Sequence, residues 1–342
     1  MIIGIETSCD DTSVAVLSLK GEVQGLRSAS QDNAHRPFGG VVPEVASRQH
    51  TENLLPLLEQ VMGEARCGWG QVTGIAVTSR PGLIGSLLVG LVTAKTLALA
   101  RGLPFIGVNH IEGHLLAPLL HDASYGPPQG FDFPYLGLAV SGGHTHLFHV
   151  EKPGSYKLLG RTVDDAAGEA FDKFAKMLKL GFPGGILVDR LAAQGDAKAY
   201  AFPRSMLHDD TLNFSFSGLK TAGMRAIEAI SADQLEYKQA DLCASYQEAI
   251  VEVLTEKMIR AARKTGLKNW TITGGVSANS RLRQQGLEAA KKEGATLALP
   301  PIRYCTDNAA MIALAGLYRL QSGETSGQDL SPLAHAAAAD WQ

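Results

Sequence analysis

Two fourteen-residue windows of this chain align with each other without a gap, and this internal repeat is the feature that most constrains the fold. The windows are GIETSCDDTSVAVL from Gly4 and GLAVSGGHTHLFHV from Gly137, at an offset of 133 residues. Each is an apolar run, a short polar turn and a second apolar run, which predicts a strand, a tight turn and a returning strand. We therefore expect two related lobes.

The repeated turns also predict a ligand site. Backbone N–H groups and hydroxyls in turns of this kind can hold the phosphates of a nucleotide, here in a cleft between the two lobes. Only three of the fourteen aligned positions are identical, among them Ser8 with Ser141. Chance similarity between two ordinary hairpins is therefore the alternative.

Composition and charge exclude several classes of protein. Apolar residues make up 45% of the 342 residues and charged residues 19%, which is typical of a folded globular chain. The formal net charge of −3 gives no overall attraction to nucleic acid or to an anionic membrane, so an RNA contact requires a local patch. The four cysteines lie far apart with no C-x-x-C, which fits a reducing cytoplasm. The longest apolar stretch, residues 82–94, is followed by Lys95, so we expect no membrane span.

Strand and helix patterns alternate along the chain, which favours an α/β fold. A loose segment at residues 121–133 contains two prolines and two glycines and is the expected boundary between lobes. We expect a first lobe of residues 1–130 plus 309–342 and a second lobe of residues 131–308. Strands are expected at residues 2–6, 13–19, 74–77, 105–108, 135–140, 146–150 and 270–273, and helices at 43–62, 83–100, 240–264 and 280–293.

The pentapeptide HIEGH, from His110 to His114, is the sharpest chemical signal. Residues four apart on a helix share a face, so both imidazoles can reach one metal ion. Asp307 is the expected third ligand, because it opens a later helix and such sites add a carboxylate. Two histidines and one carboxylate leave coordination positions open, as a catalytic metal site requires. The alternatives are unrelated surface histidines and an Asp307 that only caps its helix.

A metalloprotease is the obvious rival interpretation of the histidine pair. The H-E-x-x-H signature places its base directly after the first histidine. Here Glu112 is two residues on, about 200 degrees around the helix, and is expected to point away from the metal. The spacing therefore disfavours a protease.

Two further segments predict contacts to a nucleotide. In WTITGGVSANSRLR a strand runs into a glycine pair and a helix, whose free N–H groups can receive a phosphate. Asn279 in this segment either holds a ribose or base edge or bonds its own local backbone. In DDAAGEAFDKFAKMLKLGFPGG, Asp172 is placed to accept hydrogen bonds from hydroxyls, with a glycine pair at residues 184–185 that lets the backbone approach.

Nine segments in this order resemble the TsaD family: GIETSCDDTSVAV, GGVVPEVASRQH, NHIEGHLLAP, VSGGHTHL, DDAAGEAFDK, FPGG, FSFSGLKT, GGVSAN and CTDNAAMIA. The resemblance covers roughly residues 2–320. It implies a two-lobed fold similar to actin, Hsp70 chaperones and sugar kinases (the ASKHA fold), in agreement with the repeat. Two departures are Ile186, where the family commonly has proline, and a tail without the Arg-Trp pair that is frequent in the family.

The resemblance implies a reaction. The family transfers a threonylcarbamoyl group from threonylcarbamoyl-AMP to N6 of the adenosine 3′ of the anticodon in tRNAs that read codons beginning with A, and releases AMP. His110, His114 and Asp307 fall on the family's metal ligands, which bind iron(II), or sometimes zinc, between the lobes. A metalloprotease and a non-catalytic nucleotide-binding scaffold are the alternatives.

The resemblance also implies donor-binding positions and partners. We nominate Asp10 to accept the amine proton or to position the donor, with a turn-capping Asp as the alternative. Bacterial members act with a paralogue, TsaB, and an ATPase, TsaE. The helices expected at residues 43–62 and 83–100 are candidates for the TsaB contact, with ordinary core helices as the alternative. The donor-binding positions map onto Ala139, Val140, Ser141, Gly142, Gly143, Asp172, Gly185, Asp189 and Asn279.

Overall fold

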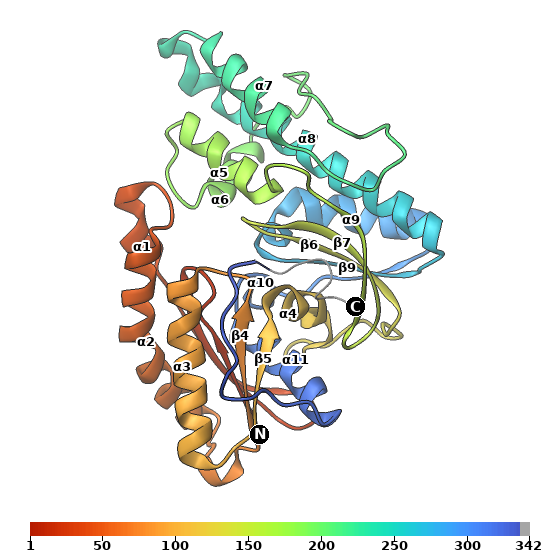
Figure 1. Cartoon of the computed structure of the whole chain (residues 1–342). Helices are drawn as coiled ribbons and strands as arrows, with labels where there is room; N and C mark the ends of the chain where they lie inside the picture. Colours follow the sequence, from red (N-terminus) through yellow and green to blue (C-terminus); the bar gives the residue numbers. More distant parts are fainter. Residues whose placement is uncertain (336–342) are drawn as a thin grey trace. The chain divides into compact units, whose positions relative to one another are not determined.

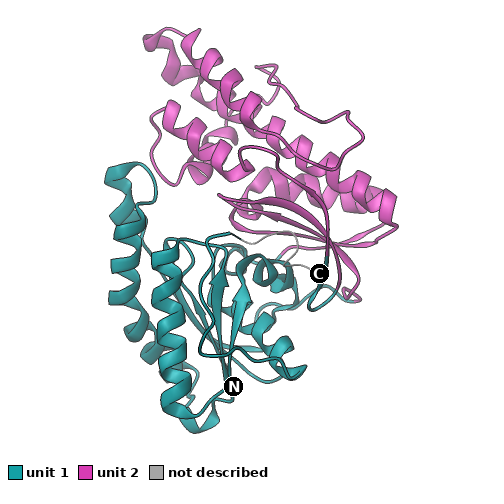
Figure 2. Ribbon diagram, in the orientation of Figure 1, with its two compact units in different colours: residues 1–129, 152–156, 300–342 teal, residues 130–151, 157–299 magenta. Residues whose placement is uncertain are grey.

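The computed structural model describes residues 1–335 and divides into two compact units (Figures 1 and 2). Unit 1 contains residues 1–129, 152–156 and the chain from Pro300 onward, and unit 2 contains the remainder. The last seven residues of the divergent tail lie outside the described part.

The boundary near the C-terminus differs from the expected one. Residues 300–308, which we expected in the second lobe, group with unit 1. The physical reason lies in helix α10 (Ile302–Cys305), where Arg303 forms an ion pair of 2.7 Å with Asp122 and the hydroxyl of Tyr304 donates to the same carboxylate. These contacts attach the segment to the loop at residues 121–125.

Each unit is built on a five-stranded mixed sheet, and the two sheets have the same strand order. The order is β3-β2-β1-β4-β5 in unit 1 and β8-β7-β6-β9-β10 in unit 2. In unit 1, β1 pairs antiparallel with β2 and parallel with β4; in unit 2, β6 pairs antiparallel with β7 and parallel with β9. The strands are β1 (Ile2–Glu6), β2 (Asp11–Leu17), β3 (Val23–Ser30), β4 (Gly74–Arg80), β5 (Phe105–Asn109), β6 (Tyr135–Val140), β7 (Thr145–Lys152), β8 (Ser155–Arg161), β9 (Asn269–Thr273) and β10 (Thr296–Ala298).

The register of the two hairpins is also the same. Gly4 on β1 lies opposite Ala15 on β2, and Gly137 on β6 lies opposite Phe148 on β7. Each member of the second pair stands 133 residues after its counterpart in the first, which is the offset of the sequence repeat. The predicted duplication is therefore confirmed at the level of strand order and register, and the two hairpins are not a chance similarity.

Helices cover both faces of the first sheet. Ile3 and Ile5 of β1 pack in one hydrophobic cluster with residues of α2 and α3, whereas Gly4, on the other face, lies against α11. A Cβ on Gly4 would collide with the carbonyl oxygen of Ala309, so the missing side chain lets α11 approach β1 closely. The helices of unit 1 are α1 (Asp32–His35), α2 (Pro43–Glu64), α3 (Ile84–Arg101), α4 (His110–Leu116), α10 and α11 (Ala309–Gln321).

Among residues 1–335, α3 is the helix that is long and apolar enough to cross a membrane, judged by length and composition only. It packs against α2, β1, β4 and β5 of unit 1. The ammonium of Lys95 donates to the carbonyl oxygens of Gln328 and Leu330, near the C-terminus of the described chain.

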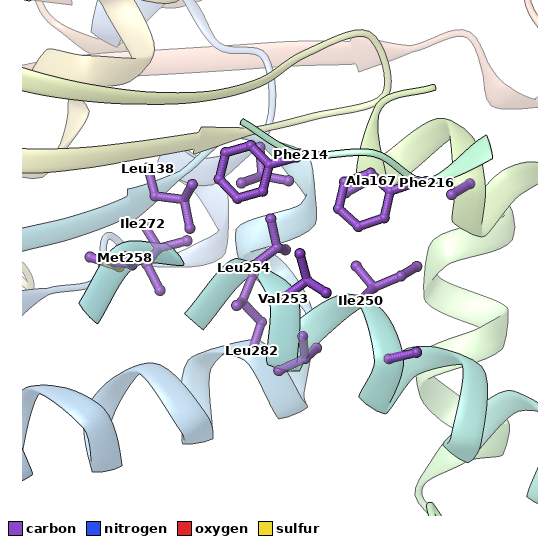
Figure 3. Packing of buried hydrophobic residues seen from close by; sticks show 14 of the residues in the cluster. Leu138, Ala167, Phe214, Phe216, Ile250, Val253, Leu254, Met258, Ile272 and Leu282 are labelled. Atoms are coloured by element: carbon purple, nitrogen blue, oxygen red, sulfur yellow. The ribbon is translucent and has the colours of Figure 1, made fainter. Parts of the chain in front are cut away.

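Unit 2 has its core between its sheet and the long helix α8, which spans 34 residues. Figure 3 shows Met258 and Leu254 of this helix near Ile272 of β9 and Leu138 of β6, and Ile250 of the same helix near Phe216. The structure begins α8 eight residues before the expected start at residue 240. The helices of unit 2 are α5 (Ala167–Met177), α6 (Gly184–Ala192), α7 (Ser217–Glu228), α8 (Ala232–Thr265) and α9 (Ser280–Glu293).

Candidate functional site

The histidine pair lies on α4, which begins directly at the end of β5. The side chain of Asn109 accepts a hydrogen bond of 2.9 Å from the backbone N–H of Ile111 and so caps the helix. This start places His110 and His114 on one face, with ring centroids 4.6 Å apart. Both side chains are buried, with residue exposures of 5% and 1%, so they are not unrelated surface histidines.

Asp307 completes the cluster from the segment before α11. Its Oδ1 atom lies 3.3 Å from Nε2 of His110 and 3.2 Å from Nε2 of His114. The cap of α11 is Asn308, whose side-chain oxygen accepts from the N–H of Met311 at 3.0 Å. Asp307 is therefore not the helix cap, and its carboxylate faces the imidazoles.

Charge and burial act against each other in this cluster. Burial alone would lower the pKa of His110, but the carboxylates of Asp307 and Glu6 raise it well above its ordinary value. Burial lowers the pKa of His114. For Asp307, burial acts to raise the pKa, and the two imidazoles hold it well below the usual range. The anionic carboxylate is the form that a metal ion would require.

The three residues fit a metal site. One ligand atom from each lies within 4.8 Å of the others, and all three residues belong to unit 1. Two imidazoles and one carboxylate suit iron(II) or zinc and leave open positions for a substrate oxygen. This is the one such group of histidine, cysteine or acidic side chains found within residues 1–335.

Sequence reasoning missed Glu6, which lies at the end of β1 and is fully buried. Its carboxylate faces Nδ1 of His110 at 2.9 Å and accepts from the hydroxyl of Thr78 at 2.6 Å and the N–H of Ser8 at 2.5 Å. The available signal was an acidic residue at the end of the apolar run IIGIE, where a buried charge requires a partner.

Glu112 points away from the histidines, as its position on the helix predicts. Its carboxylate accepts from the hydroxyl of Tyr156 at 2.9 Å and lies 3.9 Å from the guanidinium of Arg319. Burial raises the pKa of Glu112. No observation on this residue supports the role of a protease base.

Asp10 lies in the turn between β1 and β2, in the same unit as His110, His114 and Asp307. Its backbone oxygen accepts from the N–H of Gln31 at 3.1 Å, which ties the turn to the segment before α1. Burial raises the pKa of the Asp10 carboxyl, and the negative charge of Asp307 raises it further. A carboxyl of raised pKa is better suited to hold a proton.

The five adjoining residues that we expect to bind the donor lie at the turn between β6 and β7 in unit 2. The turn closes with a hydrogen bond of 2.8 Å from the N–H of Ser141 to the carbonyl oxygen of His144. Its glycines, Gly142 and Gly143, are exposed, and a Cβ at either would meet no atom within 4 Å. Ala139 and Val140 are buried in β6. The turn therefore presents open backbone to a ligand.

Asp172 of α5 and Asp189 of α6 each bond the N-terminal end of the next helix of the site, α6 and α9 respectively. Oδ1 of Asp172 accepts from the N–H groups of Gly184 and Gly185 at 2.8 and 3.2 Å, so it caps α6. Asp189 of α6 accepts from the hydroxyl of Ser280 at 2.8 Å, at the start of α9. Both carboxylates therefore hold backbone in place, a role the sequence did not indicate.

Asn279 uses its side chain within the protein. Its oxygen caps α9 by accepting from the N–H of Leu282 at 2.9 Å, and its amide nitrogen donates to Oε1 of Gln247 at 2.6 Å. Local backbone bonding, one of the two expected roles, is thus observed, and one of the two amide hydrogens has no partner within residues 1–335. Gln247 of α8 is a second residue that sequence reasoning missed.

Comparison with known proteins agrees with this geometry. The TsaD family, described as tRNA N6-adenosine threonylcarbamoyltransferase, matches residues 22–314. A protein of that name from Bdellovibrio bacteriovorus is 56% identical over 341 residues, covering 100% of this chain and 99% of its own. One from Geobacter sp. strain M21 is 50% identical over 336 residues, covering 97% and 95%.

Among solved structures, HypF from T. kodakarensis aligns with a TM-score of 0.60 at 14% identity, over 96% of this chain and 48% of its own. This likeness supports the predicted actin-like, two-sheet fold class and nothing about activity. The family match and the two relatives support the activity class. The chain therefore belongs to the TsaD family of tRNA N6-adenosine threonylcarbamoyltransferases.

Proposed function

We propose that this chain transfers the L-threonylcarbamoyl group from threonylcarbamoyl-AMP to N6 of the adenosine 3′ of the anticodon, in tRNAs that read codons beginning with A. A bond forms between N6 and the carbamoyl carbon, the bond from that carbon to the phosphate oxygen breaks, and AMP leaves. The observation that carries the proposal is the cluster of His110, His114 and Asp307 in a chain of this family.

The chemistry explains why an activated donor is required. The N6 lone pair is delocalised into the purine ring, so the amine is a poor nucleophile. A mixed anhydride with AMP supplies a good leaving group, and the amine must lose one proton during transfer. We assign the acceptance of this proton, or the positioning of the donor, to Asp10, whose carboxyl is partly buried in unit 1.

The metal in this proposal is iron(II), with zinc as the alternative. Nε2 of His110, Nε2 of His114 and Oδ1 of Asp307 would hold it, since these atoms already face one another. When bound, the ion supplies a Lewis acid that anchors and polarises an oxygen of the donor.

We assign the adenylate part of the donor to unit 2. The open backbone of Gly142 and Gly143 provides N–H groups for phosphate or carbamoyl oxygens, and the remaining amide hydrogen of Asn279 provides a donor for the nucleoside. Asp172 and Asp189 hold the starts of α6 and α9 in position around it.

A partner of the TsaB kind would bind to α2 and α3. Ile84, Leu88, Val92 and Leu99 of α3 are large apolar side chains between 42% and 74% exposed, and Leu55 of α2 is 55% exposed. The first three stand four residues apart and share one face of the helix. An apolar stripe of this kind is typical of a protein contact. We propose no binding surface on this chain for the TsaE-like ATPase.

The decisive experiment is a mass-spectrometric assay of tRNA nucleosides with the donor synthesised in situ. We expect threonylcarbamoyladenosine to form only when the chain, the TsaB-like and TsaE-like partners and tRNA are all present. We expect the reaction to take place in the cytoplasm. Full turnover by the chain alone would refute the partner dependence. Cleavage of a sialoglycoprotein that a chelator abolishes would instead support a protease.

The partner surface has its own test. Val92→Asp places a charge in the apolar stripe and is expected to weaken binding to the TsaB-like partner at least tenfold in calorimetry. Leu287→Asp on α9, where the side chain is 52% exposed, is the matched control and should bind normally. If both variants bind the TsaB-like partner equally well, the partner does not bind to the apolar stripe of α3.

A further inference from the structure

We infer that Glu6 is a positioning residue of the metal centre: it fixes the tautomer of His110 and thereby directs the Nε2 lone pair of this imidazole at the metal. The inference rests on the metal site of the proposed function. It assigns a role to a residue outside the group of predicted metal ligands.

The hydrogen bonds around His110 determine its tautomer. An ionised carboxylate only accepts hydrogen bonds, so the 2.9 Å contact with Glu6 requires a proton on Nδ1 of His110. The hydroxyl of Ser8 lies 3.2 Å from the same nitrogen and can accept as well. Nε2 also faces a carboxylate, that of Asp307, but at the longer distance of 3.3 Å. In the neutral ring the shorter contact with Glu6 therefore keeps the proton on Nδ1 and leaves the lone pair on Nε2. This is the tautomer a metal ligand requires.

His114 has no comparable support. Its Nδ1 atom is buried and finds no hydrogen-bond partner within residues 1–335. Its orientation is fixed instead through Nε2, by the contact of 3.2 Å with Asp307. Of the two imidazoles, His110 is therefore the one whose tautomer is fixed by a hydrogen bond at Nδ1.

Glu6 itself is held rigidly enough to act in this way. The N–H of Ser8 donates to Oε1, the hydroxyl of Thr78 donates to Oε2, and the residue is fully buried. These donors come from the turn after β1 and from β4, so the carboxylate is anchored on two elements. A preorganised ligand loses less freedom on binding a metal.

The substitution Glu6→Gln tests the role with little change of volume. The N–H of Ser8 keeps the amide oxygen on its own side, so the amide nitrogen faces His110 and donates to Nδ1. The imidazole proton then moves to Nε2 and blocks the lone pair. We expect the affinity for Zn²⁺ alone, measured by competition with a chromophoric chelator, to fall roughly 10- to 100-fold.

Glu112→Gln is the matched control, because Glu112 is also buried and lies on α4 but contacts Tyr156 instead. It should bind Zn²⁺ like the wild type. Thermal unfolding of the metal-free proteins checks that both variants fold. An affinity of Glu6→Gln within twofold of that of the control would overturn the inference.

A second measurement does not depend on any variant folding. Nitrogen-15 NMR of the metal-free wild-type chain at a pH where His110 is neutral should show its proton on Nδ1, and a proton on Nε2 would overturn the inference. The two proposals fail separately. If the wild type and His110→Ala bind Zn²⁺ equally, the metal site itself fails; if only Glu6→Gln binds like the wild type, the positioning role alone fails.

Discussion

Nε2 of His114 lies 3.2 Å from Oδ1 of Asp307, although 193 positions separate the two residues in the chain. Helix α11 creates this proximity, because it packs against β1, β4 and α4 and so carries the segment before it to the histidine helix. The carboxylate of Asp307 faces the imidazoles, because Asn308 and not Asp307 caps the N-terminus of α11. The three predicted ligands therefore rest on two helices, with both histidines on α4 and Asp307 directly before α11.

Replacing any one ligand should remove the metal while the fold remains. We expect His110→Ala, His114→Ala or Asp307→Asn to lower the bound metal, measured by elemental mass spectrometry, at least tenfold and to abolish tRNA modification. Far-ultraviolet circular dichroism should not change. Normal metal content together with normal activity in these variants would contradict the assignment.

Asp172→Ala should weaken donor binding more than tRNA binding. The substitution removes the acceptor of two backbone N–H groups at the start of α6, and hydrogen bonds to a charged group contribute about 1.5–3 kcal/mol. We expect roughly a tenfold loss of affinity for a non-reactive donor analogue in calorimetry. An unchanged analogue affinity would remove Asp172 from the site.

Gly168→Ala should disturb the donor turn without touching a ligand. A Cβ at this position would lie 2.5 Å from the carbonyl oxygen of Ser141 and 2.8 Å from the nitrogen of Gly142, so the turn must shift. We expect weaker binding of the donor analogue at normal metal content. Gly218→Ala is the control, because its nearest atom is a serine hydroxyl at 3.4 Å. Equal analogue affinities would contradict the prediction.

His146 should make stability depend on pH. Burial, with a smaller contribution from Arg161, lowers its pKa from 6.5 to about 4. At pH above 6.5 the His146 ring is neutral in both the folded and the unfolded chain, and its contribution to the free energy of unfolding is complete. As the pH falls from 6.5 to 4, the unfolded chain takes up the proton first, so stability is lost, by about 3 kcal/mol at most.

The measurement for His146 is urea unfolding of the metal-free chain at pH 7.5 and pH 4.5. His146→Asn should lose less stability than the wild type over this interval, because its side chain does not titrate. The difference between the two proteins isolates His146 from the other histidines. Parallel losses would show that this residue carries none of the pH dependence.

Lys257→Met should destabilise unit 2. The ammonium of Lys257 is fully buried and contacts Oδ1 of Asp209 at 2.5 Å and the carbonyl oxygen of Thr211 at 2.6 Å. Breaking a buried pair costs about 3–5 kcal/mol, and partial exposure of Asp209 favours the lower end. Lys264→Met, at an exposed position of the same helix, should change the unfolding free energy by under about 0.5 kcal/mol. A similar effect of both variants would contradict the prediction.

Much of the architecture was predictable because it depends on the residue pattern within short segments of the sequence. The repeat predicts the two matching hairpins, and the spacing of His110 and His114 predicts a shared helix face. Edge strands β3 and β8 were not predicted, because β3 has only exposed and partly exposed residues and β8 has two buried residues of seven, so neither gives a regular apolar pattern. Periodicity reports burial, and these two strands have little of it.

The supporting residues of the site could not be predicted for a different reason. Glu6 stands 104 positions from His110, and Gln247 stands 32 positions from Asn279. Neither pair has a fixed spacing that a single sequence would reveal, since tertiary packing alone brings them together. The sequence therefore indicates the ligands better than the residues that orient them.

Unit 1 is discontinuous: its first strand is made at the start of the chain and α11 near the end. During synthesis on a ribosome, the face of β1 at Gly4 stays bare until α11 emerges from the exit tunnel. The third ligand, just before that helix, arrives equally late. An ion that needs all three side chains could therefore be captured only when translation is almost finished, so loading of the proposed metal would be one of the last events in the maturation of this protein.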